Sequence, residues 1–179
     1  TIPNFKGRET FAGESFHTAK WQDGIDLSGK RVGIIGTGST ASQIIGAVTE
    51  QVEKMVVFQR TPQWIAPLPQ KKYGPITRFI MRHVPGMTAL AYWTQYIIFK
   101  YTFAPATTGN KFWQRKISEI CQRHLDKNIH DPELKAKLTP DYQAICKRLI
   151  FASDFYPAIS SPNCSLVTEA IEKISPAGV

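Results

Sequence analysis

The pattern of apolar positions is most regular between residues 30 and 60. Residues 32–35 read Val-Gly-Ile-Ile, a continuous apolar run that is typical of a strand covered on both faces. The next apolar positions recur at the spacing of one helical face: Ala41, Ile44, Ile45, Val48 and Val52. A second apolar run at residues 55–58 predicts another strand. This order predicts a βαβ unit, and therefore an α/β, Rossmann-like fold with a parallel sheet.

Helical spacing dominates the middle of the chain, from about residue 74 to residue 140. One helical face there consists of Phe112, Trp113, Ile117, Ile120, Cys121, His124 and Leu125. Asp131 before Pro132 is typical of a helix start, because an N-cap residue is followed by proline at the first helical position. Because this stretch interrupts the α/β pattern, we interpret residues 74–140 as a helical insertion.

The segments on either side of this insertion predict other structure. Residues 61–69 contain three prolines and predict a loop. Residues 141–179 predict a return to the α/β core, with a helical turn over 154–159 and strands near 165–168 and 171–174.

Residues 89–103 form the most apolar and aromatic segment of the chain. The segment is too short to span a membrane and contains Gln95 and Lys100. We interpret it as a buried core helix. The alternative is a face that docks on a neighbouring domain or on a membrane surface.

Composition narrows the class of protein. With 179 residues and 42% hydrophobic residues, the chain predicts one domain with a proper core. The net charge is +8, but the basic residues alternate with apolar positions of the helical pattern, and the sequence contains no nucleic-acid-binding motif. The three cysteines show no CxxC or metal spacing, which fits a cytoplasmic protein without a disulfide framework or a metal site. The ends at Thr1 and Val179 predict a segment cut from a longer protein, with residues 1–29 as a turn-rich linker.

A glycine pattern lies between the first predicted strand and the first predicted helix. Gly36 allows a tight turn, Gly38 allows the backbone to approach a phosphate, and Ala41 allows the helix to pack closely on the strand. A dinucleotide pyrophosphate would lie at the helix N-terminus. Further contacts to it are expected from Thr37, Ser39, Thr40 and Gln43. For Thr40 the alternative is a helix cap, and for the whole pattern it is a turn in another α/β domain.

The end of the second predicted strand selects the nucleotide. Strands that bind NAD or FAD usually end near an Asp or Glu that accepts a hydrogen bond from the ribose 2′-OH. This chain has Arg60 and Thr61 there instead, with no carboxylate nearby. A guanidinium can bind a 2′-phosphate in a bidentate manner, so the sequence predicts NADP(H) rather than NAD. The alternative is that Arg60 is a solvated charge at a strand end.

Four segments together resemble a known family. Residues 11–21 match the pattern Phe-x-Gly-x-x-x-His-x-x-x-Trp, which resembles the fingerprint of type I Baeyer–Villiger monooxygenases, a family of flavoproteins. The glycine pattern follows it, as in that family. Residues 59–62 and the basic segment 146–148 with residues 153–158 are similar to two further family segments. Trp21 favours this group over the related flavin-containing N- and S-oxygenases, although Gln22 departs from the Pro or Asp common in the group.

The resemblance implies an NADP-binding domain of a larger flavoenzyme whose FAD domain lies elsewhere in the parent chain. NADPH would reduce FAD, and one oxygen atom from O₂ would be inserted into a ketone. Arg148 would stabilise negative charge during oxygen transfer, and Lys147 would contact the 2′-phosphate. His17 would make hydrogen bonds where the linker meets the NADP domain. By itself the chain would be inactive, and its expected partners are NADPH, a ketone or other small organic substrate and the FAD domain, with neither a nucleic acid nor a membrane.

Three alternatives remain open from the sequence. The first is a domain of a flavin-dependent N- or S-oxygenase. The second is a relative of the pyridine nucleotide–disulfide reductases, which the absence of a redox CxxC pair disfavours. The third is a non-enzymatic NADP-binding regulator.

Overall fold

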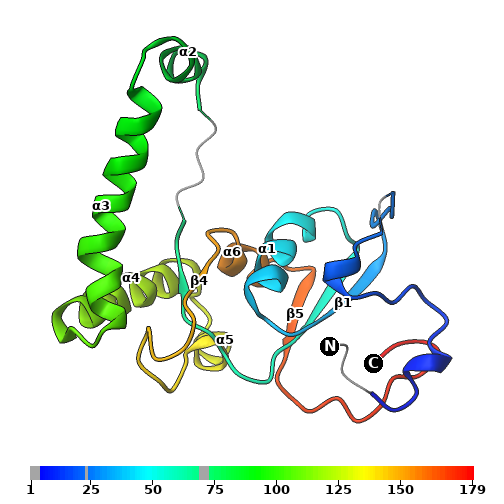
Figure 1. Ribbon diagram of the computed structural model, residues 1–179. Helices are drawn as coiled ribbons and strands as arrows, with labels where there is room; N and C mark the ends of the chain where they lie inside the picture. Colours follow the sequence, from blue (N-terminus) through cyan, green and yellow to red (C-terminus); the bar gives the residue numbers. More distant parts are fainter. Residues whose placement is uncertain (1–4, 23, 69–72) are drawn as a thin grey trace.

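The structure is a computed structural model that describes residues 5–22, 24–68 and 73–179. Its central sheet has three parallel strands in the order β1-β2-β5 (Figure 1). Strand β1 (Arg31–Ile35) pairs with β2 (Lys54–Phe58), and helix α1 (Ser39–Val48) connects them. This arrangement confirms the predicted βαβ unit and the α/β fold with a parallel sheet.

The third strand of the sheet, β5, follows the predicted helical insertion in the sequence. Strand β5 (Cys164–Val167) pairs with β2, and helix α6 (Phe155–Ile159) precedes it. Both the predicted helical turn and the first of the two predicted tail strands are therefore confirmed. The second, at residues 171–174, is wrong: these residues form no strand, and Ile174 N–H instead donates to Lys6 O, 2.8 Å away.

The main core lies on one face of the sheet, under α1 and α6. Ile45, Met55 and Val57 are fully buried there, and Val32 and Ile34 pack against them. On the opposite face Ile35 is 45% exposed. The prediction that the first strand is covered on both faces is thus wrong for these residues, because β1 is an edge strand and the core helices cover one face only.

Four helices occupy the predicted helical stretch: α2 (Pro75–His83), α3 (Met87–Thr107), α4 (Lys111–Asn128) and α5 (Pro132–Leu138). The start of α5 is capped as predicted, because the Asp131 carboxylate accepts hydrogen bonds from the first-turn N–H groups.

The buried face of α4 joins two cores. Ile117 and Cys121 belong to a second core around Trp64 and Ala106, whereas Leu125 belongs to the core of the sheet. The predicted helical face is therefore largely confirmed. Its outer members are the exception: Phe112 and Ile120 are exposed.

One strand of a second, two-stranded sheet lies within the proline-rich segment, which was predicted to be a loop. Strand β3 (Ile65–Ala66) pairs in parallel with β4 (Ile150–Phe151). The prediction was wrong at these two positions because the strand lies between Pro62 and Pro67 and depends on a partner distant in sequence. Pro69, the last residue of that predicted loop, lies outside the described residues.

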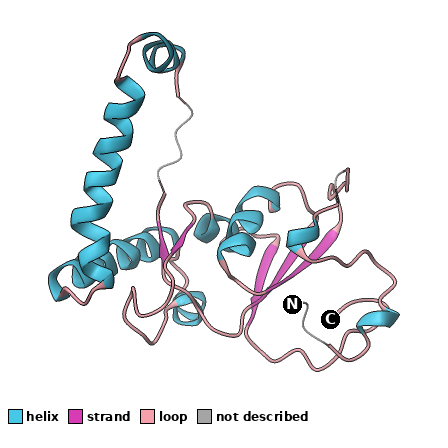
Figure 2. Ribbon diagram, in the orientation of Figure 1, coloured by secondary structure: helices cyan, strands magenta, loops and turns pink. Residues whose placement is uncertain are grey.

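Helices α2 and α3 project away from the rest of the chain (Figure 2). The only buried residue of α3 is Ala106, near its C-terminal end. Residues 89–103, interpreted from sequence as a buried core helix, are instead mostly exposed. That interpretation is wrong because apolar residues cover every side of α3, whereas the described chain offers α3 a neighbour only at its ends.

Candidate functional site

Gly36 forms the turn that the glycine pattern predicts. Its φ of +96° lies in the left-handed region, which glycine adopts without steric cost. Its N–H donates to Phe58 O at 2.8 Å, so the turn is attached to the end of β2. A Cβ at Gly36 would meet open space, so backbone conformation rather than crowding requires glycine here.

The N-terminus of α1 is open to a ligand. Gly38 is the N-cap residue and provides no side-chain cap, and a Cβ at Gly38 would also meet nothing within 4 Å. Ser42 braces the loop from behind, since its hydroxyl donates to Thr37 O at 3.2 Å and its N–H donates to Gly38 O at 2.9 Å. The uncapped first turn therefore offers N–H groups and the positive end of the helix dipole to an anion.

The predicted pyrophosphate contacts differ in their accessibility. Thr37 is buried and braces the loop through its carbonyl, Ser39 is half-buried, and Thr40 and Gln43 are exposed. Within the described part of the chain the Thr40 hydroxyl makes no hydrogen bond, so the capping alternative receives no support. Thr40 and Gln43 are free to contact a ligand at this edge of the sheet.

Close helix packing occurs five residues after the predicted position. Ala41 is only half-buried, whereas Gly46 lies against the start of α6, where its Cβ would be 2.9 Å from the Cβ of Asp154. Sequence reasoning missed Gly46. A glycine inside an otherwise regular helical pattern was the signal that could have found it.

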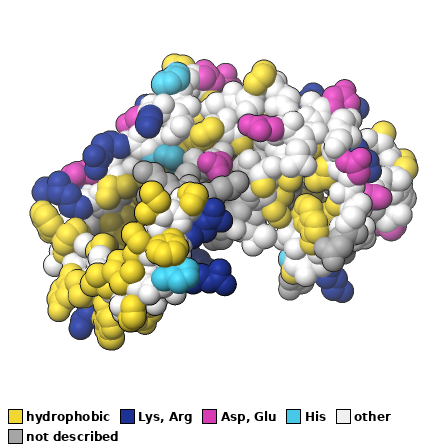
Figure 3. Space-filling view, turned by 90° about the horizontal axis from the view of Figure 1, so that it is seen from above, with side chains coloured by type: hydrophobic (Ala, Val, Ile, Leu, Met, Phe, Trp, Pro, Cys, Tyr) yellow, Lys and Arg dark blue, Asp and Glu magenta, His cyan; other side chains and the backbone are white. Residues whose placement is uncertain are grey.

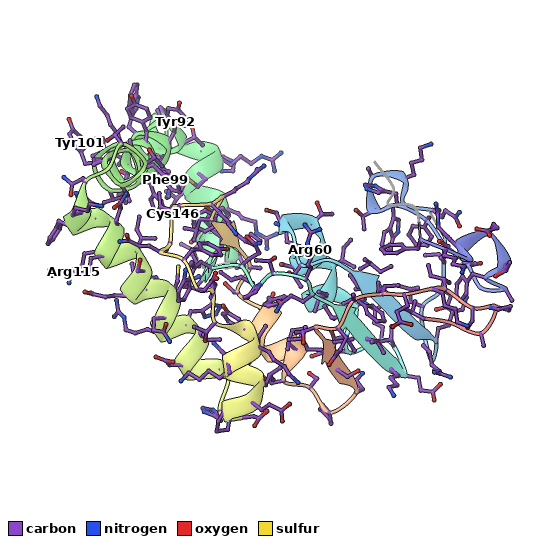
Figure 4. The ribbon with its side chains drawn as sticks, turned by 90° about the horizontal axis from the view of Figure 1, so that it is seen from below. Arg60, Tyr92, Phe99, Tyr101, Arg115 and Cys146 are labelled. Atoms are coloured by element: carbon purple, nitrogen blue, oxygen red, sulfur yellow. The ribbon has the colours of Figure 1, made fainter. Side chains whose placement is uncertain are left out.

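Arg60 lies at the same edge of the sheet as the glycine turn. The Gly36 N–H is hydrogen-bonded to Phe58 O, and Arg60 lies two residues after Phe58 in the sequence (Figure 4). Arg60 is exposed, and no carboxylate forms an ion pair with it among the residues that the structure describes. The neighbouring Gln59 is buried and donates from Nε2 to Lys137 O at 2.8 Å, which fixes the strand end against α5. Sequence reasoning missed this positioning role of Gln59.

Lys147 and Arg148 are exposed in a loop that is tied to the segment after Thr61. The Trp64 indole N–H donates to Tyr142 O, and the Tyr142 hydroxyl donates to Pro62 O at 3.1 Å. The Lys147 ammonium lies 4.1 Å from the centroid of the Tyr142 ring. Burial raises the pKa of Tyr142, so its hydroxyl keeps its proton as a donor.

The small sheet gives the two basic segments a common edge. Ile65 pairs with Ile150 in parallel, so residues 60–61 and residues 147–148 both approach this sheet from the N-terminal ends of its strands. Ile145, two residues before Lys147, has a φ of +75°, a strained conformation for a β-branched residue. The strain therefore falls in the loop that carries the second basic segment.

The contacts of His17 are local. Its Nδ1 accepts a hydrogen bond from Ala19 N–H at 3.1 Å and caps a short 3₁₀ helix, Thr18–Lys20. Trp21 is 41% exposed and packs edge-to-face on Phe16 at 5.3 Å. No hydrogen bond joins His17 to Arg60 or to the first turn of α1 within the described ranges.

The described residues hold no group of three or more His, Cys, Asp or Glu side chains that could bind a metal ion. Burial raises the pKa of Cys121 to about 12 and that of Cys164 to about 11. The candidate site presents backbone N–H groups, hydroxyls and positive charges, which suit the binding of a phosphorylated ligand.

Comparisons with known proteins point to one family. The model of a family described as flavin-binding monooxygenase-like matches residues 1–95. An uncharacterised monooxygenase of Mycobacterium tuberculosis is 35% identical over 178 residues, which cover 99% of this chain and 36% of that protein. A Baeyer-Villiger monooxygenase of Streptomyces coelicolor is 34% identical over 178 residues, which cover 97% of this chain and 33% of that protein. The chain thus spans about a third of the length of these relatives.

Solved structures agree with this result. A crystal structure of OTEMO in complex with FAD and NADP has a TM-score of 0.76 and 26% identity, and the match covers 99% of this chain and 41% of that one. A cyclohexanone-bound structure of cyclohexanone monooxygenase has a TM-score of 0.74 and 27% identity, with 99% and 42% covered.

Proposed function

The chain belongs to the flavin-binding monooxygenase-like family, and from this premise we propose that it binds NADP(H) within an FAD-dependent monooxygenase that inserts one oxygen atom from O₂ into a ketone. One observation carries the proposal: the Gly36–Phe58 hydrogen bond brings an uncapped helix N-terminus to the edge of the sheet where Arg60 lies, and Arg60 forms no ion pair with any described residue. Relatives named as Baeyer-Villiger monooxygenases and a neighbour crystallised with FAD and NADP support it.

The first turn of α1 would hold the pyrophosphate. The space that a Cβ of Gly38 would occupy is open, so a phosphate can approach the backbone closely. Ser39, Thr40 and Gln43 lie on this first turn or directly after it and would add hydrogen bonds. The residues present therefore fit a dinucleotide.

Positive charges on two segments would hold the 2′-phosphate. Arg60 and Thr61 follow β2. Lys147 lies in the loop after Tyr142, which is hydrogen-bonded to Pro62 and Trp64. A guanidinium and an ammonium together favour a doubly charged phosphate over a neutral 2′-OH. Gln59 would keep Arg60 in place through its bond to Lys137 O.

When bound, NADPH and FAD supply the hydride and the activation of O₂, which no side chain can supply. Arg148 would place a permanent positive charge where negative charge develops during oxygen transfer. His17 would fix the turn at residues 17–20 and so the course of the N-terminal segment. Because the chain spans about a third of its relatives, it would bind the nucleotide by itself without oxygenating a substrate.

Two alternatives predict different behaviour. An N- or S-oxygenase would use the same nucleotide site. The similarity to relatives named as Baeyer-Villiger monooxygenases favours the insertion of oxygen into a ketone for this chain instead. A purely regulatory NADP-binding role is disfavoured by membership of a monooxygenase family.

The nucleotide assignment is tested by calorimetric titration of the chain with NADPH and with NADH. We expect NADPH to bind more tightly, and Arg60→Ala to weaken NADPH binding by about tenfold or more, because hydrogen bonds to charged groups contribute about 1.5–3 kcal/mol. Binding of NADH should change little in this variant. Arg60→Lys should recover part of the loss, since it keeps the charge without the bidentate geometry.

Lys54→Ala is the matched control, because it removes a positive charge from the opposite end of the same strand. This variant should bind NADPH like the unaltered chain. Equal affinities for the two nucleotides in the unaltered chain, or an equal loss in Lys54→Ala, would contradict the proposed site.

A further inference from the structure

Helices α2 and α3 together form what we call the arm, residues 75–107. Among the described residues, only its C-terminal end packs against the rest of the chain: the Gln114 side-chain amide donates to Ala106 O at 3.0 Å, and the ring centroids of Phe103 and Phe151 lie 5.7 Å apart. The remainder of α3 and all of α2 extend away from both cores (Figure 1). The arm is therefore held at one end and exposed along its length.

Apolar and aromatic side chains cover all sides of α3. Figure 4 shows Tyr92 and Phe99 on one side of the helix and Tyr101 on the opposite side. The exposed members are Leu90, Tyr92, Trp93, Tyr96, Ile97, Ile98, Phe99 and Tyr101. A helix that docks on a single protein face keeps a polar stripe toward water, and α3 has no such stripe.

Two threonine hydroxyls of α3 form hydrogen bonds within the helix itself. The hydroxyls of Thr94 and Thr102 donate to the carbonyls of Leu90 and Ile98, at 2.8 and 2.6 Å. The Lys100 ammonium lies 5.8 Å from the ring centroid of Tyr96, so its charge is directed along the aromatic surface. These two hydroxyls need no water partner, so their residues can lie against an apolar surface at little cost.

The charge of the arm has one sign. Residues 54–118 contain no Asp or Glu, whereas Lys and Arg recur through them. In α2 the side chains of Ile76, Phe79 and Ile80 share one helical face, and Arg78 and Arg82 lie on the other. Figure 3 shows hydrophobic side chains gathered over this end of the molecule, with basic side chains beside them. A basic amphipathic helix of this kind is typical of helices that lie in the headgroup region of a bilayer.

We propose that the arm binds the surface of an anionic lipid bilayer. Helix α2 lies in the plane of the headgroups with Phe79 and Ile80 toward the acyl chains, and Arg78 and Arg82 face the lipid phosphates. The Trp and Tyr side chains of α3 occupy the interface, which their amphipathic rings favour. The arm does not span the bilayer, because none of the described helices combines the length and apolarity needed for crossing.

This proposal revises the expectation of no membrane partner. That expectation depended on residues 89–103 being a buried core helix, and the exposure of α3 removes its basis. Charge selects lipid over a second copy of this chain, because two arms that both lack acidic residues would repel each other. The proposal does not depend on the proposed nucleotide site.

Co-sedimentation of the chain with vesicles tests the proposal. We compare vesicles of phosphatidylcholine alone with vesicles of phosphatidylcholine and phosphatidylglycerol. Binding should be about tenfold or more tighter to the anionic vesicles, since each Lys or Arg near such a surface adds to the attraction. Added salt should weaken the binding, because it screens that attraction.

The variant Phe79→Glu should abolish most of the vesicle binding, because it places a carboxylate on the apolar face of α2. Phe112→Glu is the matched control: Phe112 is 53% exposed, on α4, outside the arm. The control should bind vesicles like the unaltered chain. Both variants should retain the far-UV circular dichroism spectrum and the thermal unfolding transition of the unaltered chain, which would show that the fold is intact.

Three results would overturn the proposal. The first is that the chain fails to bind anionic vesicles. The second is a dimer, measured by light scattering, that Phe79→Glu dissociates, so that a second copy covers the arm. The third is protection of α3 from hydrogen exchange without lipid in a polypeptide as long as the curated relatives, so that another part of the same polypeptide covers it.

Discussion

Helices α1 and α3 are both rich in apolar residues, yet their surroundings are opposite. In α1 these residues form one stripe, and Ile45 and Val48 are buried against the sheet. In α3 they cover all sides, and Tyr92 and Trp93 remain 64% and 55% exposed. The arrangement of apolar residues around the helix, more than their number, therefore determines whether this chain alone can cover them.

Replacing one isoleucine by alanine in each helix should give the largest difference between α1 and α3 in the free energy of unfolding. Ile45→Ala leaves a cavity in a fully buried core and should lower the free energy of unfolding by about 2–5 kcal/mol. Ile97→Ala, at a position 50% exposed on α3, should change it by about 0.5 kcal/mol or less. Urea denaturation measures both. Equal losses would mean that α3 is packed in solution as tightly as α1.

Glycines on α1 allow a sharper comparison within one helix. Gly46→Ala would place its Cβ 2.9 Å from Asp154 and should lower the free energy of unfolding by about 1–3 kcal/mol. Gly38→Ala meets open space and should have little effect on unfolding, but it should weaken NADPH binding by obstructing the pyrophosphate. Denaturation and calorimetry distinguish the two effects. A Gly38→Ala variant that binds NADPH as tightly as the unaltered chain would contradict the proposed pyrophosphate site at the first turn of α1.

The smallest expected effect is on the pH dependence of the free energy of unfolding, through His124 at the contact between α4 and α6. The rings of His124 and Tyr156 lie 5.0 Å apart, and burial lowers the pKa of His124 from its usual 6.5. The unfolded chain therefore takes up the proton more readily, so the free energy of unfolding should fall as the pH drops below about 6.5. His124→Gln should remove part of this dependence.

Local patterns predicted the parts of the fold that local chemistry determines. The βαβ unit was predicted from two apolar runs and from the apolar positions at helical spacing between them. The start of α5 was predicted from Asp131 and Pro132. Gly36 at a positive φ was equally readable, because only glycine adopts that turn at no cost.

Contacts between distant segments were not readable from sequence. The bond from Tyr142 to Pro62 and that from Gln59 to Lys137 each join residues about eighty positions apart, and no local pattern encodes them. The burial of residues 89–103 was misjudged for a related reason. Apolarity predicts that a helix needs cover, but it does not predict what provides that cover.

Helix α4 links the orientation of the arm to the nucleotide-binding half of the molecule. Its residues Ile117 and Cys121 fill the core beneath the arm, and Leu125 fills the core beneath the sheet. A shift in helical register by a single residue would turn these three side chains by about 100° and remove all of them from their cores together. The geometry of α4 thus gives the arm one rotational setting relative to the nucleotide edge, and a protein resting on a bilayer through this arm would present that edge at one defined tilt.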